Sequence, residues 1–320
     1  MKFNVLRKTM LSVVATSFIV GALPIQHEAH AAYTITVPTQ PVDVLLNARK
    51  MEFPDAKPFQ DENSAVMVPI RFISEKLGAK VAYQQSNGKQ TVTLKTDKHS
   101  VTLTVGSSTA VVDGQSKTYD SQIIVKQQRT YVPLRLVSEG LGQTVEWDQV
   151  GKWVWIGGKD VPTLGELNLK KNPMSMVTKY FDQRNDGYFL NNLFGDPYKN
   201  VIVIKQSELP IKFDDSTFYD IQLVQVNGIP TVLNRTSEKN LHMGYLTRKE
   251  DYRNRSAITP IQIKNADGTR FNYFDITSWY DSERLGIVEQ TPLSSKDFDY
   301  ILIKYASMDS MILLESPWNK

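Results

Sequence analysis

The sequence predicts an α+β protein with two tandem small repeats, each of antiparallel strands and a short helix, followed by a mainly antiparallel α+β domain. Three observations predict it: an internal duplication, apolar strand patterns joined by Asn-Gly and Asp-Gly turns, and an ordinary globular composition. The 320 residues are 41% apolar and include no cysteine. This length suggests about two domains. The cysteine count excludes disulfides, zinc–thiolate clusters and a cysteine nucleophile.

Residues 1–31 have the pattern of a secretory signal peptide. A basic start containing Lys2 precedes the 13-residue apolar run 10–22, which is shorter than the ~20 residues that span a bilayer. Ala29 and Ala31 are the small residues of a cleavage site, so we expect cleavage near Ala31 and a secreted or wall-associated chain without a transmembrane anchor. The mature chain then has a net charge of +1 and two histidines, His99 and His242.

The duplication relates residues 68–85, VPIRFISEKLGAKVAYQQ, to residues 132–149, VPLRLVSEGLGQTVEWDQ, with nine of eighteen positions identical. In each copy a proline suits the first turn of a helix, and a glycine suits a left-handed helix end. An arginine and a glutamate four residues apart can meet on one helix face. The shared motif residues, with the tryptophan of the second copy, are Pro69, Arg71, Glu75, Gly78, Pro133, Arg135, Glu139, Gly142 and Trp147.

Strands surround each expected helix, because short alternating apolar runs end at turn residues such as Ser86-Asn87-Gly88. We expect them at Val42–Asn47, Lys80–Tyr83, Thr91–Lys95, Val101–Val105, Ala110–Val112, Thr144–Trp147 and Trp153–Ile156.

The pattern VP-x-R, Ser-Glu helix, LG and V-x-W-D hairpin resembles the copper amine oxidase N-terminal-like domain, or stalk domain, in two copies over about residues 40–157. The first copy departs from it with Tyr83-Gln84 in place of Trp-Asp. The resemblance implies small α+β modules on secreted and surface proteins of Gram-positive bacteria, without catalysis. The expected divisions are repeats at 32–98 and 99–160, a linker at 161–172, and a domain at 173–320 that resembles no family.

The residues do not support amine oxidase activity. That chemistry needs three histidine ligands for copper and a tyrosine in an Asn-Tyr-Asp/Glu motif. The mature chain has two histidines, and Asn272-Tyr273 is followed by Phe274.

The second half reads as antiparallel strands. Asn172-Pro173 could begin a helix with Val177 and Tyr180 on its apolar face. A brief helix is expected near Ser295. Expected strands are Val201–Lys205, Tyr219–Val226, Pro230–Arg235, Phe271–Ile276, Tyr300–Tyr305 and Met311–Leu314.

The composition leaves few combinations of side chains that could form a catalytic site. There is no HExxH or GxSxG motif, so zinc-peptidase and serine-hydrolase sites are not indicated. The run from Asp182 to Gly187 lacks EF-hand ligands but leaves an irregular calcium site open. The run Arg248–Arg255 is expected to be a solvated strand or loop, with contact to anionic wall polymers as an alternative. A glycosidase needs only two carboxylates, and the candidates are Asp214, Asp215, Asp220, Asp281, Glu283, Glu289 and Asp299.

Aromatic residues give the stronger indication of binding. Trp153 and Trp155 share one face of a strand, and Trp279 and Tyr280 are adjacent in the second half. Exposed rings of this kind can stack on sugars, whereas buried rings would pack between layers.

The sequence therefore favours a secreted, non-catalytic cell-envelope protein that needs no cofactor or metal. The repeats would act as a spacer or adhesion unit, and the C-terminal domain would bind a cell-wall component or an envelope protein. Nucleic acid is not an expected partner, because neither half is strongly basic. A carboxylate-dependent glycan hydrolase on a stalk and an extracellular sensor or inhibitor domain are the alternatives.

Overall fold

The computed structural model describes residues 33–38, 42–181, 186–192, 194–213, 216–239, 242–278, 281, 283, 292–303 and 309–319. The expected signal peptide lies outside these ranges. Within them, no helix is long and apolar enough to cross a membrane.

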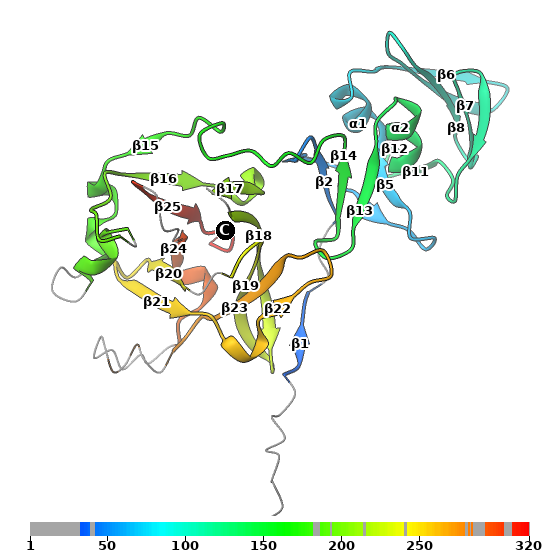
Figure 1. Ribbon diagram of the computed structural model, residues 1–320. Coiled ribbons are helices and arrows are strands. Elements are labelled where there is room, and N and C mark those ends of the chain that lie inside the picture. Colours follow the sequence, from blue (N-terminus) through cyan, green and yellow to red (C-terminus); the bar gives the residue numbers. More distant parts are fainter. Residues whose placement is uncertain are drawn as a thin grey trace, which may run out of the picture. The chain divides into compact units, whose positions relative to one another are not determined.

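Three sheets form the part from Val42 to Gly157 (Figure 1). The largest, in spatial order, contains β10 (Gln115–Thr118), β9 (Thr109–Val112), β8 (Ser100–Thr104), β7 (Lys89–Lys95) and β6 (Lys80–Ser86). The second contains β11 (Ile124–Lys126), β12 (Arg129–Pro133), β5 (Val66–Pro69) and β4 (Phe59–Gln60). The third contains β13 (Val145–Asp148), β14 (Trp153–Ile156), β2 (Asp43–Leu46) and β3 (Arg49–Lys50).

The two α-helices with described bounds are α1 (Ile70–Lys76) and α2 (Leu134–Gly140), and each directly follows the strand that carries the Val-Pro pair. Pro69 and Pro133 are the N-cap residues, one position before the expected first turn, with extended ψ angles of 119° and 123°. Apolar side chains at helical spacing, such as Ile70 and Ile73, are buried. One hydrophobic core receives side chains from both copies of the duplicated segment.

The strands before the helices pair with each other in a symmetric register. Val68 on β5 lies opposite its duplicate Val132 on β12, and Pro69 lies opposite Tyr131 while Met67 lies opposite Pro133. The pairing is therefore the same when viewed from either copy, as it would be if a local two-fold axis related β5 to β12. Each helix therefore starts from the same small sheet.

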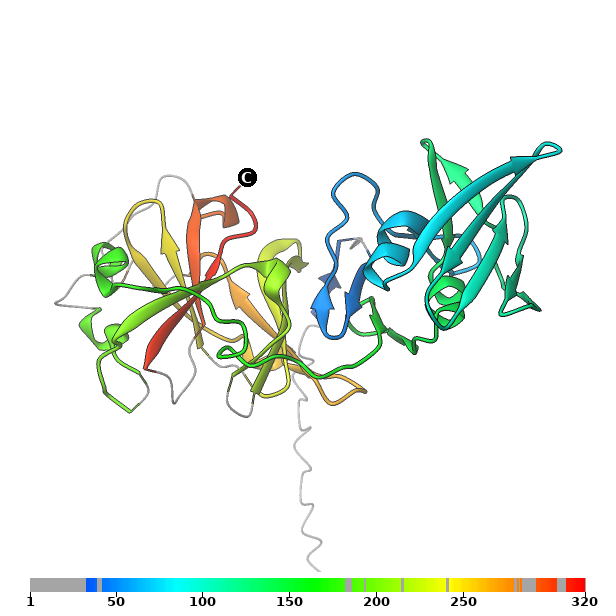
Figure 2. The same ribbon diagram turned by 90° about the horizontal axis from the view of Figure 1, so that it is seen from above.

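The part after Asp160, together with β1 near the start of the described chain, forms two six-stranded sheets, one on each side of a shared core (Figure 2). The first has the order β1 (Ile35–Thr36), β18 (Ser216–Val226), β19 (Ile229–Thr236), β23 (Arg270–Asp275) and β22 (Ile263–Lys264), and β17 (Ile211–Phe213) also pairs with β18. The second has the order β15 (Lys171–Asn172), β16 (Asn200–Ile204), β25 (Ser310–Glu315), β24 (Phe298–Ile303), β20 (His242–Thr247) and β21 (Tyr252–Ser256). The α+β class is thus mostly antiparallel strand.

The expected helix after Pro173 is replaced by two 3₁₀ turns, η1 (Met174–Met176) and η2 (Thr178–Tyr180). Its apolar residues Val177, Tyr180 and Phe181 are nevertheless buried together, so core packing outweighs helix propensity. The brief helix near Ser295 is the 3₁₀ turn η6 (Ser295–Asp297), closed by a capping box from Ser294. The remaining turns are η3 (Gly187–Leu190), η4 (Gln206–Glu208) and η5 (Thr259–Ile261).

Residues 161–172, which are expected to be a linker, make contacts with the part of the chain that follows them. Leu164 is buried in the shared core, and its backbone N–H donates to the carbonyl of Lys212 at 3.3 Å. Asn172 then pairs with Val201 as part of β15 and β16.

Candidate functional site

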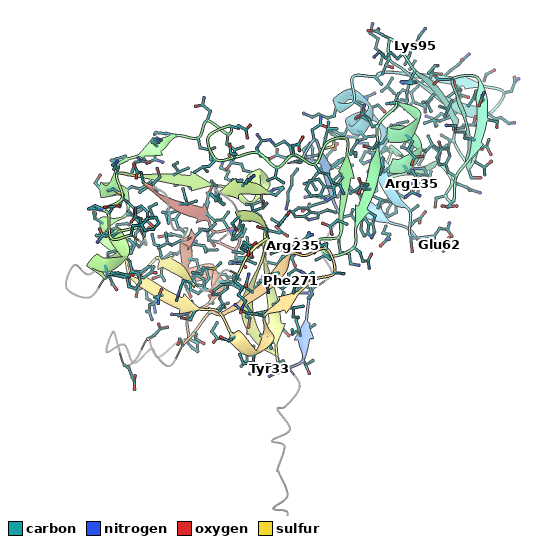
Figure 3. The ribbon with its side chains drawn as sticks, in the orientation of Figure 1. Tyr33, Glu62, Lys95, Arg135, Arg235 and Phe271 are labelled. Atoms are coloured by element: carbon teal, nitrogen blue, oxygen red, sulfur yellow. The ribbon has the colours of Figure 1, made fainter. Side chains whose placement is uncertain are left out.

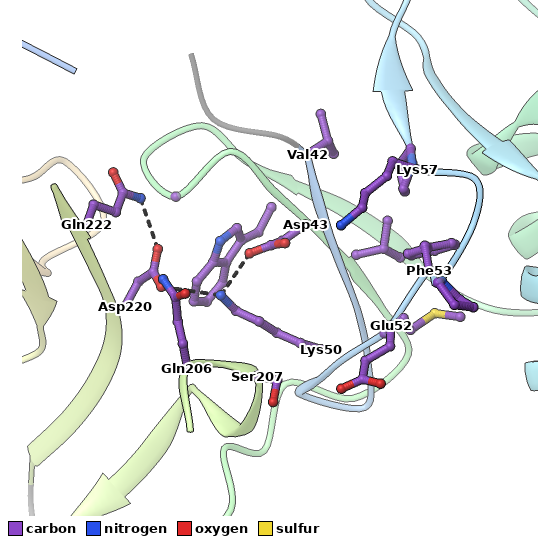
Figure 4. Close-up of a pocket in the computed structure, with 16 residues that line it drawn as sticks. Val42, Asp43, Lys50, Glu52, Phe53, Lys57, Gln206, Ser207, Asp220 and Gln222 are labelled. Carbon is purple, nitrogen blue, oxygen red and sulfur yellow. Dashed lines mark hydrogen bonds and ion pairs between the residues drawn. The ribbon is translucent and has the colours of Figure 1, made fainter. Parts of the chain in front are cut away.

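A cavity of about 480 Å³ lies beside Lys50 and is lined by residues from both halves of the sequence (Figure 4). Lys50 occupies the short hairpin of β2 and β3, whose turn residues Asn47 and Ala48 both have positive φ, 48° and 59°. Two such residues form a turn with the twist that a two-residue hairpin requires. The turn thereby places Lys50 beside Asp43 on the neighbouring strand.

The ammonium group of Lys50 binds two carboxylates. Its Nζ lies 2.8 Å from Oδ2 of Asp43 and 3.3 Å from Oδ1 of Asp220 (Figure 4). Gln222 donates a 2.9 Å hydrogen bond to the other oxygen of Asp220. Burial lowers the pKa of Lys50, but attraction to Asp220 and Asp43 outweighs it, and the net result is a raised pKa. Lys50 therefore keeps its positive charge between the two carboxylates.

Arg235 forms a second charge cluster close to the cavity. Its Nη1 donates to Asp148 at 2.6 Å, its Nη2 to Asp267 at 2.5 Å, and its Nε to the Thr269 hydroxyl at 3.1 Å. The side chain is only 5% exposed and lies on β19 opposite Phe271 of β23 (Figure 3). All three nitrogens of this guanidinium group are thus satisfied, as a buried cation requires.

The ring of Trp153 is contacted by both cations. Lys50 Nζ lies 4.8 Å and the Arg235 guanidinium carbon 5.6 Å from its ring centroid. Such cation–π contacts are attractive, particularly where water is excluded. They help to explain why two cations are tolerated around one buried indole.

The expected stacking residues have different positions. Trp153 and Trp155 are 1% and 6% exposed, and their ring centroids are 5.8 Å apart in a small cluster with Leu45 and Ala48. Their burial favours the packing alternative over stacking on a ligand. Trp279 and Tyr280 lie outside the described residues.

The duplicated glycines adopt the expected conformation. Gly78 and Gly142 have φ angles of 76° and 79°, in the left-handed region that glycine enters without a Cβ clash. A Cβ on Gly142 would also lie 2.7 Å from the His99 ring. That ring in turn bonds Asp113 at 2.9 Å.

The expected arginine–glutamate pairs behave differently in the two copies. Arg135 Nε lies 3.5 Å from Glu139, as an exposed pair that contributes little stability. Arg71 makes no ion pair with any described residue, and its guanidinium lies 5.9 Å from the ring centroid of Tyr83.

The expectation of a solvated run at Arg248–Arg255 is wrong for three of its residues, since Tyr252 is 1% exposed and two arginines are also buried. Arg253 and Arg255 on β21 are 0% and 3% exposed. Arg255 donates two hydrogen bonds to Asp281, at 2.9 and 2.7 Å, and Arg253 Nη1 lies 3.3 Å from the same carboxylate. The charged residues of this segment therefore form buried ion pairs. Arg253 and Arg255 are two positions apart on a strand, so their side chains point to the same side of the sheet.

The described members of the candidate glycosidase carboxylates have separate partners. Asp220 and Asp281 bind cations, and Asp299 accepts a 2.8 Å hydrogen bond from Tyr180. Glu283 is exposed. Asp214, Asp215 and Glu289 lie outside the described residues, as do residues 182–185 of the candidate calcium run. In the described ranges, no three His, Asp or Glu side chains are grouped to hold a metal.

Lys50, Asp43 and Arg235 had no signal in the sequence. The partners Lys50 and Asp220 are 170 positions apart, and Arg235 and Asp148 are 87 apart. Of the charged residues near the cavity, only Asp148 belongs to a motif that the sequence reveals, the V-x-W-D motif. It is the last residue of β13 and accepts hydrogen bonds from the backbone N–H groups of Val150 and Gly151 in the following turn.

The arrangement can hold a polar ligand but lacks a proton-transfer pair. Glu52, Lys57, Gln206 and Gln222 line the cavity and offer both donors and acceptors. Asp43 and Asp220 share the single positive charge of Lys50, whereas general acid catalysis requires a carboxyl group that carries a proton.

Comparison with known proteins bears on the first half of the chain. No curated protein and no solved structure shows a significant match. Residues 45–156 match the family model of the copper amine oxidase N-terminal domain, the family that the duplicated motif resembles.

Proposed function

We propose that this is a secreted, non-catalytic protein of the cell envelope. Residues 32–98 and 99–160 would be two stalk-type modules that act as a spacer or adhesion unit. Residues 173–320 would bind a cell-wall component or an envelope protein. The matched domain supports the stalk, and the signal-peptide pattern supports export.

One observation carries the non-catalytic part of the proposal: of the three described carboxylates that line the cavity, Asp43 and Asp220 are bound to a cation, which leaves only Glu52 outside an ion pair. Asp43 and Asp220 share Lys50, while Asp148 and Asp267 share Arg235. A glycosidase needs one protonated and one free carboxyl group with space for a sugar between them. The open part of the cavity instead presents amides and single charges, which suit binding.

The test is cosedimentation of the mature chain, residues 32–320, with purified Gram-positive cell walls. The cavity variant combines Glu52→Lys with Lys57→Glu, because both side chains are exposed at the cavity that Gln206, Ser207, Asp220 and Gln222 of residues 173–320 also line. The matched control is Lys89→Glu, an exposed lysine on β7 outside the cavity. We expect wild type and control to sediment with the walls and the cavity variant to remain in solution.

Two results would contradict the proposal. Failure of the wild type to bind walls or any extracted envelope protein would remove the binding role. Release of soluble sugar by the wild type, abolished by one Asp or Glu substitution, would favour the glycan hydrolase. Asp214, Asp215, Glu289 and the cavity residue Glu52 are the substitutions to examine first, since Asp43 and Asp220 are paired with Lys50.

A further inference from the structure

Each of the two copies of the VP-x-R motif lines a groove at the surface. The first motif groove, about 460 Å³, has Arg71 and Tyr83 on its walls. The second motif groove, about 150 Å³, has Arg135 and Trp147 in the corresponding positions. These residues align in the duplicated segments, so the same motif shapes a groove twice.

Each groove is completed by the other copy. Residues 128–130, at the turn into β12, line the first groove, and residues 63–66, at the turn into β5, line the second. The symmetric register of β5 and β12 explains this exchange, because each strand carries its turn to the partner's helix. The pairing that forms the core thus also forms both grooves.

The groove walls present side chains that are exposed or half-buried, and of these Trp147 also packs against the hydrophobic core. Tyr83 is 41% exposed, and Arg71 is exposed with no ion pair among the described residues. In the second groove, the Arg135 side chain is 61% exposed. Trp147 is half-buried and donates a 2.6 Å hydrogen bond from its indole to Gln149. An aromatic ring and a guanidinium fork therefore face solvent together in both places.

The charge of the grooves indicates what they can bind. Arg129 in the first groove is paired with Asp55 at 2.6 Å, and the second groove is lined by Asp120 as well as Arg135. Neither groove has the concentration of like charge that selects a polyanion. Guanidinium, carboxylate and the amides of Gln90, Gln128 and Asn63 instead mix donors and acceptors, which matches a ring of hydroxyl groups.

We propose that the two motif grooves are subsites for an uncharged polysaccharide. One sugar ring would stack on Tyr83 and another on Trp147, with Arg71 and Arg135 donating hydrogen bonds to sugar hydroxyls. Two equivalent subsites on one chain suit a polymer of repeating units, because linked subsites raise the overall affinity. This goes beyond the proposed function, which assigns the binding of wall components to residues 173–320.

The test is NMR titration of the mature, isotope-labelled chain with four uncharged trisaccharides: maltotriose, cellotriose, laminaritriose and N-acetylchitotriose. A fifth titration uses short heparin fragments as the anionic comparison. We expect at least one uncharged trisaccharide to shift the Trp147 indole resonance and the backbone resonances around Tyr83. Tyr83→Ala and Arg135→Ala should each weaken binding at their own groove at least about tenfold, which corresponds to about 1.4 kcal/mol, and leave the other groove unchanged.

Both side chains are well exposed, so these variants should fold, and Tyr188→Ala serves as an exposed aromatic control outside the grooves. The proposal is overturned if no uncharged trisaccharide shifts either groove, or if only heparin does. It is also overturned if the shifts of the first groove persist unweakened in Tyr83→Ala or those of the second groove in Arg135→Ala. The cavity variant Glu52→Lys/Lys57→Glu separates the two proposals. If sugar still shifts the groove resonances in this variant, the groove subsites are supported even where the variant or the wild type fails to sediment with cell walls.

Discussion

The guanidinium group of Arg235 donates a 2.6 Å hydrogen bond to the carboxylate of Asp148, and both side chains are nearly buried, at 5% and 11% exposure. Asp148 is the aspartate of the second V-x-W-D motif, and the first copy has Gln84 in its place. The two copies are therefore not interchangeable. Only the second carries the carboxylate that the strand β19 binds.

Replacing Asp148 by Ala should destabilise the chain by about 3–5 kcal/mol, because Arg235 is left buried with one fewer carboxylate. Urea denaturation of the mature chain measures the change. Glu146→Ala is the matched control on the same strand, since its pair with Lys159 is exposed and should contribute less than about 1 kcal/mol. Equal losses in the two variants would contradict the importance of the buried pair.

Gly151→Ala should disturb the same contact from its other side. A Cβ at this position would lie 2.3 Å from Arg235 Nη1 and 3.1 Å from the Asp148 carboxylate. Since the guanidinium is held by three partners, we expect a loss of about 1–3 kcal/mol in thermal or urea unfolding. Gly158→Ala is the control, because its nearest neighbour would be 3.7 Å away. Wild-type stability of Gly151→Ala would show that Arg235 can move without cost.

Lys50→Met should be among the more destabilising single substitutions, because Asp220, 7% exposed, would lose its cation. The expected loss is about 3–5 kcal/mol. Removing the second charge in Lys50→Met/Asp220→Leu should recover much of it, since a buried ion pair replaced by apolar groups is often tolerated. A double variant no more stable than Lys50→Met would refute this account. Lys159→Met is the exposed control.

Stability should fall as the pH rises from about 10 to 12. Burial raises the pKa of Tyr198 and of Tyr273 to about 12, whereas the unfolded side chains titrate near 10. In that window the unfolded state releases protons that the folded state keeps, so the free energy of unfolding decreases with pH. Each residue should account for up to about 3 kcal/mol. Denaturation at several alkaline pH values, compared with Tyr198→Phe/Tyr273→Phe, isolates this contribution; identical pH profiles would exclude it.

Local patterns sufficed for much of the fold. The expected strands from Val42 to Ile156 and from Val201 to Leu314 correspond to observed strands within a few residues, and Gly78 and Gly142 have the expected left-handed conformation. The sequence does not predict β5, β12 or β20, and it predicts a solvated strand or loop for the charged run Arg248–Arg255, which includes most of β21. Arg253 and Arg255 are instead buried by ion pairs with Asp281, a partner that no local pattern reveals.

By itself, the sequence determined the duplication, the two short helices and the family of residues 45–156, since each depends on residues close together in the chain. Only the tertiary structure decided which side chains meet. In the folded chain Trp153 is buried beside Lys50 and Arg235, and Asp43 and Asp220 are paired with Lys50. Each motif copy also has a groove that residues of the other copy complete. The physical reason is that ion pairing and burial depend on distances in space, and the partners here lie up to 170 positions apart.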